Sequence, residues 1–420
     1  MKSKKMIAST ALLLIVMLVA FCFIGCENTM NSDTPGGGVE SKYKGLSDDN
    51  NQAINLKDYS KAGSLESLDF TKVKSGNKAL PFLSKKEIKD MYNDTNPARL
   101  ESLANRGNLA TLQKTSFGEQ NMFKVPSFVN PYFPGEPRKD ILDLALARYN
   151  FVRRFAGLNG AEFNEKFHIE AQYAAWICAM YNRTDRSHSA AAYTRPDGVS
   201  DETWNLVDQG LSQCLYLSPH AANSVDIYMG DNGNGNLAHR KNLLNLYTTQ
   251  VGFGVASANL EGKNRNDQNV VFYTKGATAF RFNWVKQPEY QEFDYDLIAW
   301  PPAGYFPVNT ALFDNGTDQD RWSVSLNDAK YALQIKADAA GKKTKVSVTI
   351  AKASGGSETL DLDTLKTISY GSPTIFYLPG KAYEDGDKYT VKFENLMDKV
   401  NNQLTTLEYT VEFFDMSKVQ

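Results

Sequence analysis

Residues 236–256 read NLAHRKNLLNLYTTQVGFGVA. Apolar residues at helical spacing give way to an alternating, glycine-punctuated run, so the stretch predicts a short amphipathic helix that leads directly into a strand. His239 lies in this helix, and the chain contains only four histidines. It is therefore a candidate ligand, a candidate acid/base group or a core residue, and the surrounding sequence must decide between these roles.

Longer helices are predicted upstream of this stretch. From Asp140 to Gly157, the apolar residues fall on one face at helical spacing, and Gly157 ends the helix. A second helix is predicted over 165–181, with inward-facing Ile169, Tyr173, Trp176, Ile177 and Met180. Ser218 and Pro219 supply an N-cap and a first-turn proline for a third helix through Tyr228. Strands are predicted at 251–257 and 270–276.

Four motifs follow one another along the chain: RRFAGL at 153–158, His-Ser at 188–189, HRKNLLN at 239–245 and VGFG at 251–254. Their order and spacing resemble the bacterial branch of the CAP superfamily, which contains the cysteine-rich secretory, antigen 5 and pathogenesis-related proteins. The resemblance covers about residues 138–285. It implies an α-β-α sandwich, with helices on both sides of a mainly antiparallel sheet, and thus an α+β fold.

The resemblance also bears on the role of His239. In CAP domains two histidines and usually two glutamates face a surface cleft, and the histidines can hold a divalent metal such as zinc. His188 and His239 match the two histidine positions. The glutamates do not match, because Glu202 is the only glutamate between them and residues 210–212 read GLS where Gly-Glu-Asn is expected. Asp231, in a glycine-rich loop eight residues before His239, is a candidate carboxylate from its spacing alone.

A histidine pair without glutamates limits the chemistry. Catalytic zinc usually has three protein ligands and an open position for water, and hydrolysis also requires a general base. His188 and His239 are therefore expected to be hydrogen-bonded framework residues or a weak divalent-metal site, with the nearest nitrogens about 3 to 4 Å apart. Catalysis is the third alternative. His168 and His220 are expected to be solvent histidines, and the DNGNGN run at 231–236 is expected to be a turn because it lacks the ligand pattern of an EF-hand.

The N-terminus predicts export. Three lysines precede an apolar run over 6–24, which ends in FIGC at 23–26 and resembles a lipobox. Residues 1–25 are thus predicted to be a lipoprotein signal peptide and Cys26 the lipidated residue, with a transmembrane anchor as the alternative. The expected location is the cell envelope, at the outer membrane, its periplasmic face or the cell surface, with the lipid as the membrane contact. In that oxidising compartment Cys178 and Cys214 either pair or remain buried thiols.

Composition divides the mature chain into four parts. Residues 26–59 are a flexible tether, 60–137 an N-terminal wrapping extension, and 138–318 the CAP domain with an aromatic, proline-rich connector at 299–307. Residues 319–420 are expected to fold separately as an Ig-like β-sandwich, because five short alternating strands recur between turns: WSVSL, KVSVTI, TIFYL, KYTVKF and LEYTVEFF.

Charge excludes one class of partner. Without residues 1–25 the chain has 43 basic and 48 acidic residues, a formal charge of −5, which lacks the basic field that nucleic acid requires. Because CAP domains are mostly binding or signalling proteins, the resemblance implies a non-enzymatic module for a protein partner or a small apolar ligand. A metal-dependent peptidase or esterase that uses His188 and His239 is the alternative.

Overall fold

A computed structural model of the chain describes residues 80, 82–96, 121–181, 188–212, 214–216, 221–231, 237–263, 269–283, 295–308, 310, 321–332, 346–361, 366–368, 374–377 and 383–420. The predicted signal peptide and tether, with Cys26, lie outside these residues, as does His220. No helix within the described ranges is long and apolar enough to cross a membrane.

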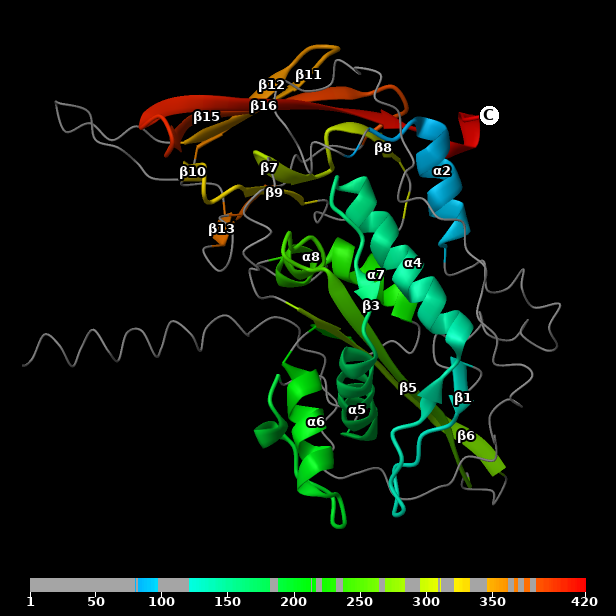
Figure 1. Cartoon of the computed structure of the whole chain (residues 1–420). Helices are drawn as coiled ribbons and strands as arrows, with labels where there is room; N and C mark the ends of the chain where they lie inside the picture. Colours follow the sequence, from blue (N-terminus) through cyan, green and yellow to red (C-terminus); the bar gives the residue numbers. More distant parts are fainter. Residues whose placement is uncertain are drawn as a thin grey trace, which may run out of the picture.

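The first half of the fold is built around a four-stranded sheet of order β3-β5-β6-β4. Its strands are β3 Glu162–Phe163, β4 Cys214–Tyr216, β5 Gln250–Lys263 and β6 Asn269–Phe282. β3 pairs with β5 in parallel, and the other pairs are antiparallel. Helices α5 (Glu165–Tyr181) and α6 (Asp201–Leu211) lie on one side, whereas α4 (Lys139–Phe155), α7 (Ala221–Gly230) and α8 (Ala238–Leu243) lie on the other (Figure 1). The fold is α+β.

Two glycines of β5 allow α5 to pack directly on the strand. Phe253 points toward α4, where its ring lies 6.2 Å from that of Tyr149. Gly252 and Gly254 alternate with it: a Cβ at Gly254 would lie 2.0 Å from the backbone oxygen of Ala171, and a Cβ at Gly252 would lie 2.2 Å from the backbone nitrogen of His168. The glycine-punctuated strand thus has one face for apolar side chains and one for the backbone of a helix.

Side chains of α5 also complete the edge of β5 beyond the short strand β3. His168 Nδ1 donates to the Phe253 carbonyl at 2.6 Å, and Gln172 exchanges two hydrogen bonds with the backbone of Val255 at 2.7 and 2.9 Å. Residues four apart on a helix rise about 6 Å, close to the two-residue step of a strand. His168 was expected to be a solvent histidine. It is instead a half-buried residue of α5 that bonds to the edge of β5.

The helices agree closely with the predicted segments where periodicity was clear. α4 and α5 span the predicted stretches, although Ile169 is 40% exposed instead of facing inward. Helix α6 was not predicted. Its start does carry a signal, since Ser200 accepts a hydrogen bond from Thr203 N at 3.2 Å and acidic residues fill the first turn.

The second half is a β-sandwich of two sheets. One has the order β12-β11-β15-β16-β8, with β10 paired to β15, and the other has the order β13-β14-β9-β7. Trp322 of β9 lies 5.9 Å, between ring centroids, from both Tyr389 of β15 and Phe413 of β16, so the sheets face each other across a shared core. The strands are β7 Leu297–Trp300, β8 Gly304–Pro307, β9 Trp322–Leu326, β10 Tyr331–Ala332, β11 Ser347–Lys352, β12 Ser357–Asp361, β13 Lys366–Ile368, β14 Thr374–Tyr377, β15 Lys388–Asp398 and β16 Gln403–Phe414.

The structure contradicts the expected domain boundary between residues 318 and 319. The connector supplies two strands of the sandwich: β7 pairs antiparallel with β9, and β8 pairs in parallel with β16. A boundary at 318 would therefore cut both sheets. Prolines at 301, 302 and 307 interrupt the apolar alternation, which is why the sequence favoured a connector here.

One apolar core passes from the helices into the sandwich. Phe155 of α4 stacks on Phe306 of β8, with a centroid distance of 5.3 Å, and meets the edge of Trp300 at 5.4 Å. Phe306 in turn lies 5.8 Å from Phe413 of β16. The two halves are thus joined through aromatic side chains and not by a linker alone.

The described parts of the N-terminal extension lie against both halves. Helix α2 (Lys85–Asp94), with a Ser84–Glu87 capping box, packs beside α4, β8 and the 3-10 helix Met416–Lys418. Lys89 Nζ donates to the Val419 carbonyl at 2.5 Å. Further along, β1 (Met122–Lys124) and β2 (Glu136–Pro137) pair with each other and contact β5.

Candidate functional site

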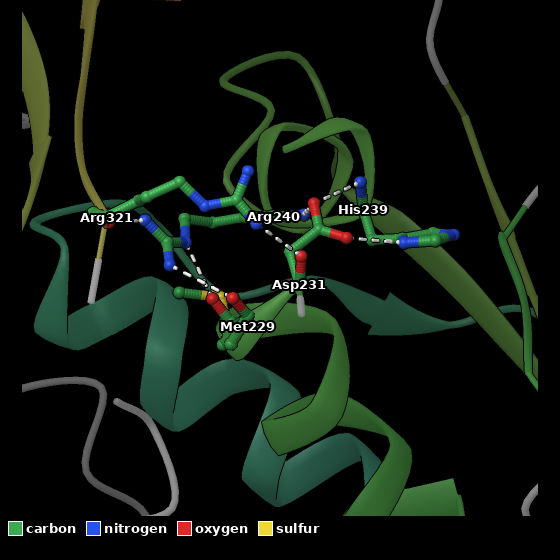
Figure 2. Close-up of polar contacts among 6 residues, drawn as sticks. Met229, Asp231, His239, Arg240 and Arg321 are labelled. Atoms are coloured by element: carbon green, nitrogen blue, oxygen red, sulfur yellow. Dashed lines mark hydrogen bonds and ion pairs between the residues drawn. The ribbon is translucent and has the colours of Figure 1, made fainter. Parts of the chain in front are cut away.

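Asp231, directly after α7, holds the start of α8. Its Oδ1 accepts the Nδ1 proton of His239 at 2.7 Å, and its Oδ2 accepts the backbone N–H groups of His239 at 3.0 Å and Arg240 at 3.3 Å (Figure 2). Asp231 is 2% exposed. One buried carboxylate therefore caps a helix and orients the imidazole that the sequence singled out.

Tyr228 of α7 packs against the face of the His239 ring, whereas Asp231 binds the ring at its Nδ1 edge. The two rings stack with centroids 4.8 Å apart and planes 24° apart, and the His239 side chain keeps 20% of its surface exposed. Because Nδ1 donates to Asp231, the neutral ring carries its lone pair on Nε2. A carboxylate behind a histidine is the usual support of a metal-binding imidazole.

His188 has the same tautomer with a different partner. Its Nδ1 donates to the carbonyl oxygen of Leu211, the last residue of α6, at 2.9 Å. The side chain is half-buried. Its neutral form therefore also carries the lone pair on Nε2.

Both histidines are held by helices that contact strand β6, α6 for His188 and α7 for His239. The end of α6, which holds His188, leads into β4 at Cys214, and Cys214 pairs with Phe280 of β6. The ring of Phe280 lies 5.0 Å from that of Tyr228, on which His239 stacks. Different elements thus hold the two imidazoles, α6 for His188 and α7 with α8 for His239, and these elements lie on opposite sides of the sheet.

The structure gives Asp231 a different role from the one expected from its spacing. Both carboxylate oxygens are used to hold His239 and α8, so Asp231 orients a candidate ligand instead of being one. Glu202 is exposed in the first turn of α6, at the opposite end of that helix from the His188 contact. In the part of the chain that the structure describes, no group of three or more His, Cys, Asp or Glu side chains is arranged to hold a metal.

Two buried arginines adjoin the Asp231–His239 pair, and no pattern in the sequence pointed to them. Arg240 Nε donates to the Met229 carbonyl at 2.6 Å, and Arg321 Nη2 donates to the Asp231 carbonyl at 3.0 Å. Burial lowers the pKa of Arg321, and nearby Asp231 partly opposes this effect. Burial also lowers the pKa of Lys241, in α8, to about 8.

Of Cys178 and Cys214, the structure describes only the side chain of Cys178. Cys178 of α5 is buried, with its sulfur 3.6 Å from the Tyr193 hydroxyl oxygen. Cys214 is described by its backbone alone, in β4.

Comparisons with known proteins do not assign the chain to a family. No family model matches the chain, and no curated protein matches it. Among solved structures, CopC from Methylosinus trichosporium OB3b aligns with 30% of this chain and 98% of its own, at 11% identity and a TM-score of 0.19. That score is too low to support an argument about fold or function.

Proposed function

We propose that the protein is a lipid-anchored cell-envelope protein whose CAP-type domain is a non-enzymatic binding module for a protein partner or a small apolar ligand, and whose histidine pair binds a divalent metal weakly. The arrangement of helices on both sides of a mainly antiparallel sheet is the one that the CAP resemblance implies. The envelope location rests on the N-terminal sequence signal.

The observation that carries the metal part is the hydrogen bond from His239 Nδ1 to buried Asp231. It fixes the ring in the tautomer that has its lone pair on Nε2, and the Leu211 carbonyl does the same for His188. Two imidazoles are fewer than the three protein ligands of a typical catalytic zinc. Weak, exchangeable binding is therefore the expected behaviour.

A metal-dependent peptidase or esterase is the second candidate. The same Asp231–His239 pair favours it, because a carboxylate that holds a histidine in one tautomer is how many hydrolases prepare a general base. This candidate needs a metal-bound water or a nucleophile beside His239 in addition.

Calorimetric titration of the full chain with Zn²⁺ separates the proposals. We expect one weak site at pH 7.5, weaker binding as the pH falls because protons compete with the metal for its ligands, and loss of binding in His188→Ala and His239→Ala. His168→Gln is the matched control and should retain binding, because His168 contacts a strand edge. Absence of binding in the wild type would contradict the metal site, and Zn²⁺-dependent ester or peptide hydrolysis abolished by His239→Ala would establish the enzyme.

A further inference from the structure

Two arginines form a reciprocal contact between the helical half and the β-sandwich. Arg240 of α8 donates through Nη1 to the backbone oxygen of Arg321 and, at 3.4 Å, to Ser323 Oγ of β9. In the other direction, Arg321 Nη2 donates to the backbone oxygen of Asp231 at 3.0 Å. Both arginines are buried, Arg240 at 2% and Arg321 at 9% exposure. Figure 2 shows the two guanidinium groups on the same side of Asp231.

The contact with Arg321 falls on a residue whose backbone is unusual. Asp231 has a φ of 52°, in the left-handed region, where residues with a Cβ are uncommon and need support from their surroundings. A fixed Asp231 carbonyl holds the backbone at this residue and so limits where its carboxylate can lie. That carboxylate in turn accepts the Nδ1 proton of His239, so the sandwich is two hydrogen bonds away from the imidazole.

We infer that Arg321 is a positioning residue for His239, acting through Asp231, so that the β-sandwich completes the histidine site of the helical half. As a statement about metal affinity, this inference rests on the proposed function. As a statement about the imidazole, it stands on the hydrogen bonds alone. The histidine site then depends on both halves, because Arg321, the residue immediately before β9, supports Asp231.

The test follows the histidine ring protons by NMR in the full chain labelled with ¹⁵N-histidine. The Nδ1 proton of His239 is assigned by its loss in His239→Gln, and that of His168, bonded to the distant Phe253 carbonyl, is the internal reference. We expect Arg321→Gln to shift or broaden the His239 signal and leave the His168 signal unchanged. Arg321→Lys, which keeps a charged donor at the end of a long side chain, should retain the His239 signal at an intermediate position.

Arg154→Gln is the matched control, since Arg154 is a buried arginine of α4 at 6% exposure that lies near Glu87 of α2. It should leave the His239 signal unchanged. If Arg321→Gln does not fold, Arg321→Lys decides: a shifted His239 signal supports the inference, and an unshifted one overturns it. A folded Arg321→Gln with a wild-type His239 signal also overturns it.

Zinc titration of the same variants separates this inference from the proposed function. We expect Arg321→Gln to weaken Zn²⁺ binding about tenfold, as loss of support behind a ligand commonly does. If the wild type binds no Zn²⁺, the proposed metal site fails, while the His239 signal still decides whether Arg321 positions the ring.

Discussion

Gly254 sets the distance between α5 and β5, and a methyl group there has no space. Its Cβ would lie 2.0 Å from the backbone oxygen of Ala171, which cannot move without moving the helix. We therefore expect Gly254→Ala to lower the free energy of unfolding by about 3 kcal/mol, at the upper end for overpacked cores. The midpoint of urea unfolding measures this.

Gly160→Ala is the control for the glycine substitution. The added methyl group meets only the side chain of Asn150, at 3.1 Å, so the midpoint should change much less. Equal midpoints for wild type and Gly254→Ala would mean that α5 does not pack on the strand in the way the structure has it.

Local pattern predicted some of the residues at the site and could not predict the others. Asp231 and His239 are eight positions apart, so a turn can bring them together, and the spacing alone raised Asp231 as a candidate. Arg321 reaches Asp231 across 90 positions, and no periodicity or spacing connects residues so far apart. Its role depends on how two halves of the chain meet, which is visible only in the folded molecule.

At the scale of elements, a buried ion pair joins α4 to α7. Arg148 Nε and Nη2 donate to the two carboxylate oxygens of Asp226 at 2.7 and 3.0 Å, and Nη1 donates to the Tyr92 carbonyl and Thr95 Oγ1 at 3.2 Å. Burial raises the pKa of Asp226, and Arg148 opposes this effect. The same guanidinium group thus connects α2, α4 and α7.

We expect Asp226→Asn to destabilise the protein by about 3–5 kcal/mol, because it leaves the Arg148 charge buried without its carboxylate. The double variant Arg148→Met/Asp226→Leu should recover most of this loss, since it removes both buried charges. Asp90→Asn, which breaks the exposed Lys86–Asp90 pair, is the control and should change stability by less than about 1 kcal/mol. A single variant as stable as this control would contradict the expectation.

Elements with a clear period were predicted well, and those without one were not. The alternation in LEYTVEFF predicted β16, because one face of that strand is buried in the sandwich. WSVSL alternates in polarity and predicted β9, although nearly every residue of β9 is buried. β7 and β8 were missed because the burial pattern of β7 is continuous and prolines surround both strands. Their assignment requires knowledge of their partners β9 and β16.

At the scale of the whole molecule, the shared aromatic core predicts one unfolding transition. Phe155 of α4 and Phe413 of β16 both contact Phe306, so neither half keeps a complete core alone. We expect helical circular dichroism and tryptophan fluorescence to report the same urea midpoint. Two separated midpoints would show that the halves unfold independently.

Fragments provide the matched comparison. Residues 321–420 lack both β7 and β8 and should remain largely unfolded, whereas residues 295–420 contain every strand of the two sheets and should gain more β structure by circular dichroism. A well-folded 321–420 fragment would restore the boundary that the sequence suggested.

The parallel pairing of β8 with β16 has a consequence for the order in which the chain is made. β8 is complete at residue 307, yet its partner strand ends at residue 414, and the Val419 carbonyl that receives Lys89 of α2 comes later still. During synthesis, both segments must wait for residues 411–419 before these contacts can form, and such long-range closure is slow. Helix α2 can therefore pack on α4 early, but its contacts are complete only after residues 416–419 have been made.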